Sequence, residues 1–130
     1  MKFIVLSGRI LYSLIFLQAI MFHFSEKAIT YATFAGVPFA LFLVPLSGIM
    51  AFAGALSIIL GYKAKLGAWL IIFFLIPITF MMHAFWKETD PMHAQFQMSM
   101  FMKNLSMLGA AFMISYFGSG PLSLDKRNEN

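Results

Sequence analysis

Residues 66–86, LGAWLIIFFLIPITFMMHAFW, contain no charged side chain. A helix rises about 1.5 Å per residue, so about twenty apolar residues cross a hydrocarbon core about 30 Å thick. This stretch therefore predicts a transmembrane helix. Similar stretches lie at about 4–24, 39–60 and 96–117. They are too long for barrel strands and lack the required alternation, so we expect an all-α integral membrane protein, a four-helix bundle.

The composition supports the same class. Of the 130 residues, 61% are hydrophobic and only 11% are charged. A soluble domain of this size could not bury so much apolar surface, so we expect membrane lipids around a single domain spanning residues 1–130. Without cysteine, the chain has no disulfide, thiolate-bound zinc or iron–sulfur cluster. The basic residues are scattered, so a nucleic-acid partner is not expected.

The distribution of basic residues predicts the orientation. Four spans would place the N-terminus, the second connection and the tail 118–130 on one side, which carries Lys2, Arg9, Lys63, Lys65, Lys126 and Arg127. The positive-inside rule therefore predicts that both termini are cytoplasmic. On the opposite side, the mixed apolar and polar residues from Ser25 to Pro38 predict a short interfacial helix.

Three polar residues are candidates for a binding pocket. Lys103 lies inside the fourth predicted span, where a central charge costs about 2.5–3.5 kcal/mol, so it is a functional candidate unless its long stem carries the charge to the headgroups. His23 and His83 end two spans on the same side. Together these three could bind the carbonyls of a quinone, or a lipid, beneath Met and Phe side chains. The alternative is that both histidines bond only to headgroups, water or carbonyls.

Other polar and small residues have structural interpretations. Asp125 is the expected counter-charge for Arg9. Small residues along the second span, Ser47, Gly48, Ala51, Gly54 and Ala55, indicate close approach of another helix, within the chain or in a homo-oligomer. The histidines, Glu88 and Asp90 are too scattered to predict a metal site. Without a phosphate loop, serine elbow or intramembrane acid pair, catalytic residues stay unknown.

Several short motifs are distinctive in their order along the chain: Gly8-Arg9-Ile10-Leu11, Phe101-Met102-Lys103-Asn104-Leu105 and the ending from Gly118 to Asp125. With other short segments, over nearly the whole chain, they resemble the DoxX family of small four-helix bacterial membrane proteins. The resemblance implies a multi-pass protein of the bacterial inner membrane, described as an oxidoreductase subunit. Arg9, Lys103, Asn104 and Asp125 match the polar pattern of that family, and His23 falls where relatives often carry Lys or His. Ala51 departs from the Glu that many relatives carry, which weakens a redox role.

The resemblance and the polar residues together predict an accessory subunit of a quinone-linked membrane redox complex. Quinone would be the cofactor, bound by His23, His83 and Lys103, while Arg9, Asn104 and Asp125 would be structural polar residues. A redox partner protein and a homo-oligomer are the expected protein partners. The alternative function is a non-catalytic membrane scaffold, or a sorting and recruitment factor.

Overall fold

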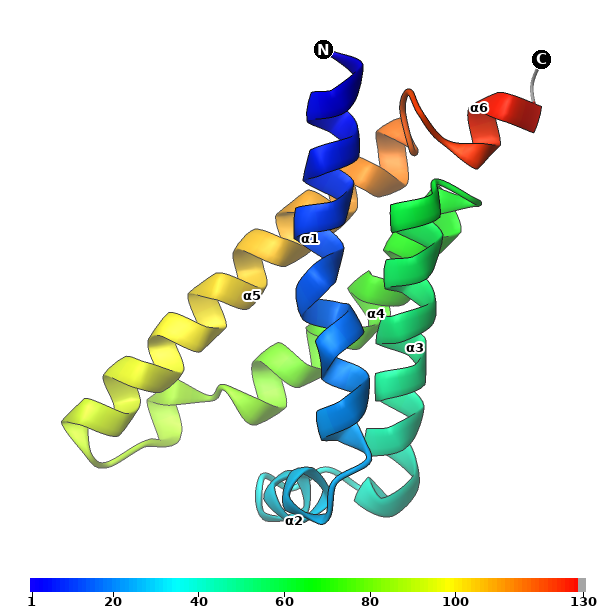
Figure 1. Ribbon diagram of the computed structural model, residues 1–130. Coiled ribbons are helices and arrows are strands. Elements are labelled where there is room, and N and C mark those ends of the chain that lie inside the picture. The colour runs from blue at the N-terminus through cyan, green and yellow to red at the C-terminus, as the bar shows by residue number, and fades with distance from the viewer. Residues whose placement is uncertain (129–130) are drawn as a thin grey trace.

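The computed structural model describes residues 1–128, which form six α-helices and one short 3-10 helix without a strand (Figure 1). This confirms the all-α class. The elements in chain order are α1 (Lys2–His23), α2 (Glu26–Phe34), α3 (Ala40–Leu60), α4 (Ala64–Met82), η1 (Phe85–Lys87), α5 (Pro91–Phe117) and α6 (Leu124–Asn128).

Three segments within residues 1–128 are long and apolar enough to cross a membrane: Lys2–His23, Ala40–Leu60 and Ala64–Lys87. The fourth predicted span lies within α5, which is 27 residues long. It is more polar than the other three because it carries Gln95, Gln97, Lys103 and Asn104. The prediction of four equivalent spans is therefore confirmed for three segments and not for α5.

The connections follow local capping chemistry. The predicted interfacial helix is present as α2, and the Ser25 hydroxyl caps it by accepting a hydrogen bond from the Ala28 amide at 3.2 Å. At the start of α5, the Asp90 carboxylate accepts from the His93 amide at 2.8 Å, and Pro91 occupies the first turn. Both caps satisfy amides that the first turn of a helix leaves unpaired.

The third span was expected at about 66–86, and the apolar segment runs over Ala64–Lys87. It is not one continuous α-helix, because α4 ends at Met82 and the chain turns into η1. The rings of Phe85 and Trp86 there pack against Phe101 of α5, with centroid distances of 5.4 and 5.8 Å. This aromatic contact joins η1 to α5 instead of extending α4. The short helix α6 in the tail was also not predicted.

The long helices do not form the closed four-helix bundle that we expected. Extensive contacts join α1 to α3, α3 to α4 and α4 to α5, and Figure 1 shows α5 diverging from α1 toward the end of the molecule that carries α2. The buried residues of α5 are Gln97, Asn104 and Ala111. Because they recur every seven residues, they form one narrow seam, which fits one neighbouring helix better than two.

Close approach between helices depends on glycine. A Cβ at Gly54 of α3 would lie 2.8 Å from the carbonyl oxygen of Gly67 in α4, and a Cβ at Gly48 would lie 2.6 Å from Cβ of His23 in α1. Ala51 and Ala55 are fully buried in the same core as Phe16 of α1. The small residues of α3 therefore make contacts within the chain, as one of the two interpretations predicted.

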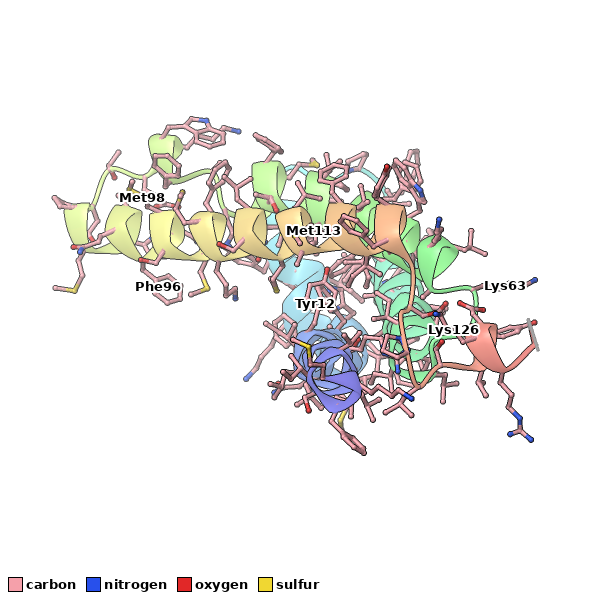
Figure 2. All side chains as sticks on the ribbon, turned by 90° about the horizontal axis from the view of Figure 1, so that it is seen from above. Tyr12, Lys63, Phe96, Met98, Met113 and Lys126 are labelled. Atoms are coloured by element: carbon pink, nitrogen blue, oxygen red, sulfur yellow. The ribbon has the colours of Figure 1, made fainter. Side chains whose placement is uncertain are left out.

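The two ends of the molecule differ in what they carry. The N-terminus, the tail helix α6 and the α3–α4 turn lie at one end, here called the terminal end, and α2 lies at the other, the α2 end (Figure 1). Figure 2 looks onto the terminal end and shows Lys63 and Lys126 on the same side of the molecule. Tyr12 connects α1 with α5, because its hydroxyl donates to the Met107 carbonyl at 3.0 Å.

Candidate functional site

A cavity of about 590 Å³ lies at the α2 end. It is formed by the end of α1, by α2, by the first half of α3 and by the second half of α4. Only four of its lining side chains are polar: His23, Tyr31, Ser47 and His83. The others are apolar, namely Phe22, Ala28, Ala32, Val37, Pro38, Leu43, Val44, Leu46, Met50, Phe73, Phe74, Pro77, Ile78, Met81 and Met82.

His23 is held in place at this cavity by α1 and α3. Its Nδ1 lies 2.7 Å from the carbonyl oxygen of Ala19, one turn earlier in α1. Its ring packs against Phe74 of α4, with centroids 5.5 Å apart. Gly48 of α3 leaves room for this side chain, since any larger residue there would collide with it. The position of His23 therefore depends on a glycine of the neighbouring helix.

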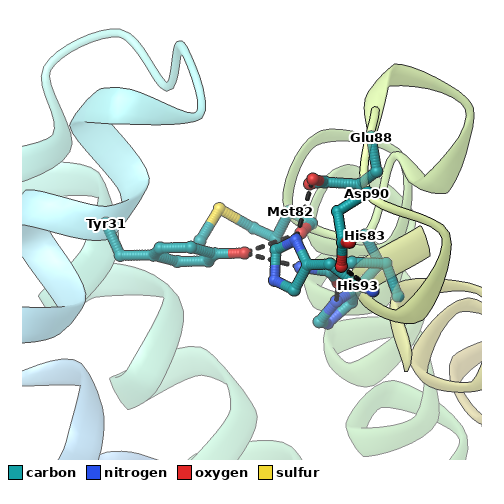
Figure 3. Close-up of polar contacts among 7 residues, drawn as sticks. Tyr31, Met82, His83, Glu88, Asp90 and His93 are labelled. Atoms are coloured by element: carbon teal, nitrogen blue, oxygen red, sulfur yellow. Dashed lines mark hydrogen bonds and ion pairs between the residues drawn. The ribbon is translucent and has the colours of Figure 1, made fainter. Parts of the chain in front are cut away.

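His83 belongs to a hydrogen-bonded network that joins three elements (Figure 3). Its Nδ1 lies 2.8 Å from Oε1 of Gln97 in α5. The Gln97 amide nitrogen donates to the Tyr31 hydroxyl oxygen of α2 at 2.9 Å, and that hydroxyl donates to the Met82 carbonyl at 3.4 Å. Gln97 is only 3% exposed, so this network is the polar centre of the α2 end.

The sequence reasoning missed Gln97 and assigned no role to Tyr31. A signal for Gln97 existed: it precedes Asn104 and Ala111 at seven-residue intervals, which is the spacing of a packed helical seam. A glutamine on such a seam needs hydrogen-bond partners because its amide is removed from water and lipid headgroups. The partners themselves come from distant segments and could not be identified from spacing.

The three predicted pocket residues are not all brought together. His23 and His83 both line the cavity, but Lys103 does not. Lys103 is exposed on α5, where its Nζ lies 3.4 Å from the sulfur of Met100. The neighbouring residue Asn104 is the buried one, and successive helical residues point about 100° apart. The cavity therefore brings together two of the three predicted residues, and a binding role for any of them stays a prediction.

His93, Glu88 and Asp90 serve the start of α5. The His93 Nδ1 lies 2.8 Å from a Glu88 carboxylate oxygen, and Asp90 accepts from the His93 amide. Within residues 1–128, no group of three or more His, Asp or Glu side chains is arranged to hold a metal ion. These residues thus order the connection between η1 and α5.

A second polar cluster lies at the terminal end, around Arg9. The Arg9 side chain is 4% exposed, and its Nη2 donates to the Leu122 carbonyl of the tail. The charge of Arg9 acts on Asp125, the expected counter-charge, but within residues 1–128 the two form no direct ion pair. The two carboxylate oxygens of Asp125 accept instead from the amides of Lys63 and Ala64 at 2.7 and 3.3 Å, which caps α4. Within the described chain, Arg9 Nε and Nη1 and the buried Ser13 hydroxyl have no hydrogen-bond partner.

Asp125 makes the stability of this cluster depend on pH. Burial opposes its ionisation, but hydrogen bonds from Lys63, Ala64 and Ser119 and the charge of Arg9 outweigh burial and lower the pKa of Asp125 below its ordinary value. The ionised carboxylate therefore stabilises the folded state at neutral pH, and this contribution is lost as the pH falls through the folded-state pKa.

We expect Asp125→Asn to lower the free energy of unfolding at neutral pH by about 1 kcal/mol, because hydrogen bonds to a charged acceptor contribute about 1.5–3 kcal/mol and those to a neutral one about 0.5–1.5 kcal/mol. The difference between wild type and variant should disappear in acid, because the wild-type carboxylate is then protonated. Thermal unfolding in mild detergent at about pH 7 and at a pH well below the ordinary aspartate pKa of about 3.9 measures both values. A difference that persists unchanged in acid would contradict the charge-dependent cap.

The helical fold and the apolar spans define an integral membrane protein, which carries an apolar cavity at one end. Residues 1–130 match the SURF4 family, so the chain belongs to that family. The predicted resemblance to the DoxX family is therefore wrong: it was inferred from the order of short motifs along nearly the whole chain, and the family model that matches residues 1–130 is that of SURF4.

A curated relative gives the location. The chain is 29% identical over 102 residues to the Inner membrane protein YphA of Escherichia coli (strain K12), covering 78% of this chain and 72% of the relative. With the apolar spans found above, this shows a multi-pass protein of the inner membrane, as predicted. Its exposed apolar side chains contact membrane lipids. No solved structure matches the chain.

Proposed function

We propose that this protein binds a lipophilic molecule of the membrane in the cavity at the α2 end, without catalysing its conversion. The observation that carries the proposal is the size and lining of that cavity. At about 590 Å³ it falls within the range of small-molecule sites, about 300–1,000 Å³. An almost entirely apolar wall with a few convergent polar groups is the arrangement of such sites.

The cavity wall is continuous with the lipid-facing surface. Phe22, Leu46 and Phe73 line the cavity and are also more than half exposed, at 57%, 57% and 59%. A ligand dissolved in the bilayer would therefore reach the cavity laterally, past these three side chains, without passing through water. This access favours an amphiphile with an apolar tail over a water-soluble metabolite.

The proposed orientation places the cavity at the outer leaflet. The terminal end carries Lys2, Arg9, Lys63, Lys65, Lys126 and Arg127 against Asp125, whereas the α2 end carries Lys27 and Lys87 against Glu26, Glu88 and Asp90. The positive-inside rule then favours cytoplasmic termini. In this orientation α5 crosses the membrane beside α4 as a fourth, more polar span, and α2 lies in the outer interface.

Blocking the cavity tests the proposal. Ser47 lines it from α3, and its hydroxyl donates only to the Val44 carbonyl of its own helix, at 2.7 Å. Ser47→Phe should fill part of the cavity and reduce the amphiphile retained per chain at least tenfold. Native mass spectrometry of the protein released from mild detergent, with solvent extraction and identification of the bound molecule, measures this.

The matched control is Ser106→Phe. Ser106 is an exposed serine of α5 that likewise bonds a carbonyl of its own helix, that of Met102 at 3.1 Å, but it lies outside the cavity. This variant should retain the wild-type amount. Equal retention in all three proteins would refute the pocket and favour the alternative function in scaffolding or recruitment. The predicted link to a redox complex depended on the DoxX resemblance, so it is not part of this proposal.

A further inference from the structure

The backbone carbonyls that bond the polar side chains of the cavity decide which of their atoms can donate a hydrogen bond and which can only accept one. A carbonyl oxygen can only accept, so His23 Nδ1, which lies 2.7 Å from the Ala19 carbonyl, must carry the hydrogen. A neutral imidazole has one N–H, which leaves Nε2 of His23 as a bare acceptor. Nε2 makes no hydrogen bond within residues 1–128.

The same reasoning applies to His83 through two more residues. The Tyr31 hydroxyl donates to the Met82 carbonyl, so its oxygen is left to accept from the Gln97 amide nitrogen. The Gln97 carbonyl oxygen therefore faces His83, and Nδ1 of His83 must donate to it across 2.8 Å. Nε2 of the neutral His83 ring is then also an acceptor. Figure 3 shows this chain of bonds from Tyr31 to His83.

The other polar side chains of the cavity have no donor to offer. The single proton of Tyr31 is used on Met82, and that of Ser47 is used on the Val44 carbonyl. All four polar side chains lining the cavity thus have their protons bound within the protein when the histidines are neutral. The cavity presents imidazole acceptors on an apolar wall. This is the reverse of the carbonyl-binding donors that we predicted from the sequence.

We propose that the cavity selects an amphiphile whose head carries hydroxyl donors, and discriminates against one that carries only acceptors. This inference rests on the proposed function and specifies the ligand class. A hydroxyl head would donate to Nε2 of His23 or His83, while its tail lies against the apolar wall and the lipid. A hydroquinone and an acylglycerol share this chemistry.

Paired probes that differ only in the donor hydrogens test the inference. We would use a long-chain alkyl hydroquinone and its dimethyl ether, and a monoacylglycerol and its dimethyl ether, with the protein in nanodiscs at about pH 8, where ordinary histidine is neutral. The hydroxyl probe of at least one pair should bind about ten times more tightly than its ether, as expected for matched rather than unmatched hydrogen-bonding groups. The pair with the larger ratio of hydroxyl-probe affinity to ether-probe affinity shows whether the ligand is a hydroquinone or an acylglycerol.

The histidine variants give the second readout. In the double variant His23→Phe and His83→Phe, the ratio of hydroxyl-probe affinity to ether-probe affinity should fall close to one, while the ether binds as in wild type. The control His93→Phe, outside the cavity, should keep the wild-type ratio. Equal binding of hydroxyl and ether probes to wild type, with both abolished by Ser47→Phe, would refute hydroxyl selection but leave the pocket intact. If no probe binds to wild type, both the selection and the pocket are refuted.

Discussion

Gly61→Ala is expected to lower the free energy of unfolding by about 3 kcal/mol. Gly61 ends α3 with φ of +64°, a left-handed conformation that costs an L-residue roughly 1–2 kcal/mol. A Cβ there would also collide with Arg9 Nη1 and Ser123 Cβ and lie 3.0 Å from Ser123 Cα. Displacing packed groups adds roughly 1–3 kcal/mol.

Because the Gly61 carbonyl also accepts from the Asp125 amide at 2.8 Å, the substitution should loosen the whole terminal cluster. Thermal unfolding in mild detergent and the rate of proteolysis within residues 118–128 measure the two effects. The control is Gly109→Ala in α5, where a Cβ meets nothing within 4 Å. That variant should gain roughly 0.5–1 kcal/mol, as alanine does in a helix interior. Equal thermal unfolding midpoints for Gly61→Ala and Gly109→Ala would show that Arg9 and Ser123 do not pack on Gly61.

Gly54→Leu is expected to destabilise the fold by about 3 kcal/mol or more. The Cβ would lie 2.8 Å from the Gly67 carbonyl oxygen and 3.0 Å from the Ile71 side chain. Overpacking typically costs about 1–3 kcal/mol, and the leucine adds three further carbons beyond Cβ to this contact. Since α3 and α4 both line the cavity, their separation should also reduce amphiphile retention.

A side chain at Gly54 would collide with a backbone atom, the Gly67 carbonyl oxygen, as well as with the Ile71 side chain. The backbone part of this collision can be tested specifically. Ile71→Val removes Cδ1 from the contact but leaves the Gly67 carbonyl, so combining it with Gly54→Leu should restore little stability. Gly8→Leu is the control, because Gly8 lies on α1 with nothing within 4 Å of a Cβ. Unfolding by sodium dodecyl sulfate titration compares the variants. Full rescue by Ile71→Val would contradict the backbone contact between α3 and α4.

The positions of helices were predicted correctly from the sequence where neighbouring residues alone decide where a helix begins and ends. The first and second spans were expected at about 4–24 and 39–60, and the helices run over Lys2–His23 and Ala40–Leu60. The interfacial helix was expected between Ser25 and Pro38 and is capped by Ser25 itself. The family was misassigned because each motif used for it was short and mostly apolar, and no such motif is specific by itself; the family model over residues 1–130 gives SURF4.

The sequence predicted some of the residues that line the cavity, and their binding role stays a prediction. His23 and His83 were recognised because both end apolar stretches, and both line the cavity. Lys103 was selected for its charge, but the rotation of α5 against α4 buries Gln97 and Asn104 instead. Asp125 was paired with Arg9 by charge, yet it caps a helix that begins 61 positions away in the chain. Sequence spacing within one helix contains no information about its rotation against another.

The amino-acid sequence by itself determined that this chain is helical and lies in a membrane. Apolar stretches of this length must satisfy their backbone hydrogen bonds internally, and the helix does so without a partner. Only the tertiary structure decided which polar side chains meet and which atom of each is a donor. That outcome depends on carbonyls such as Ala19 and Met82, on glycines that allow close approach, and on helix rotation, all of which exist only after packing.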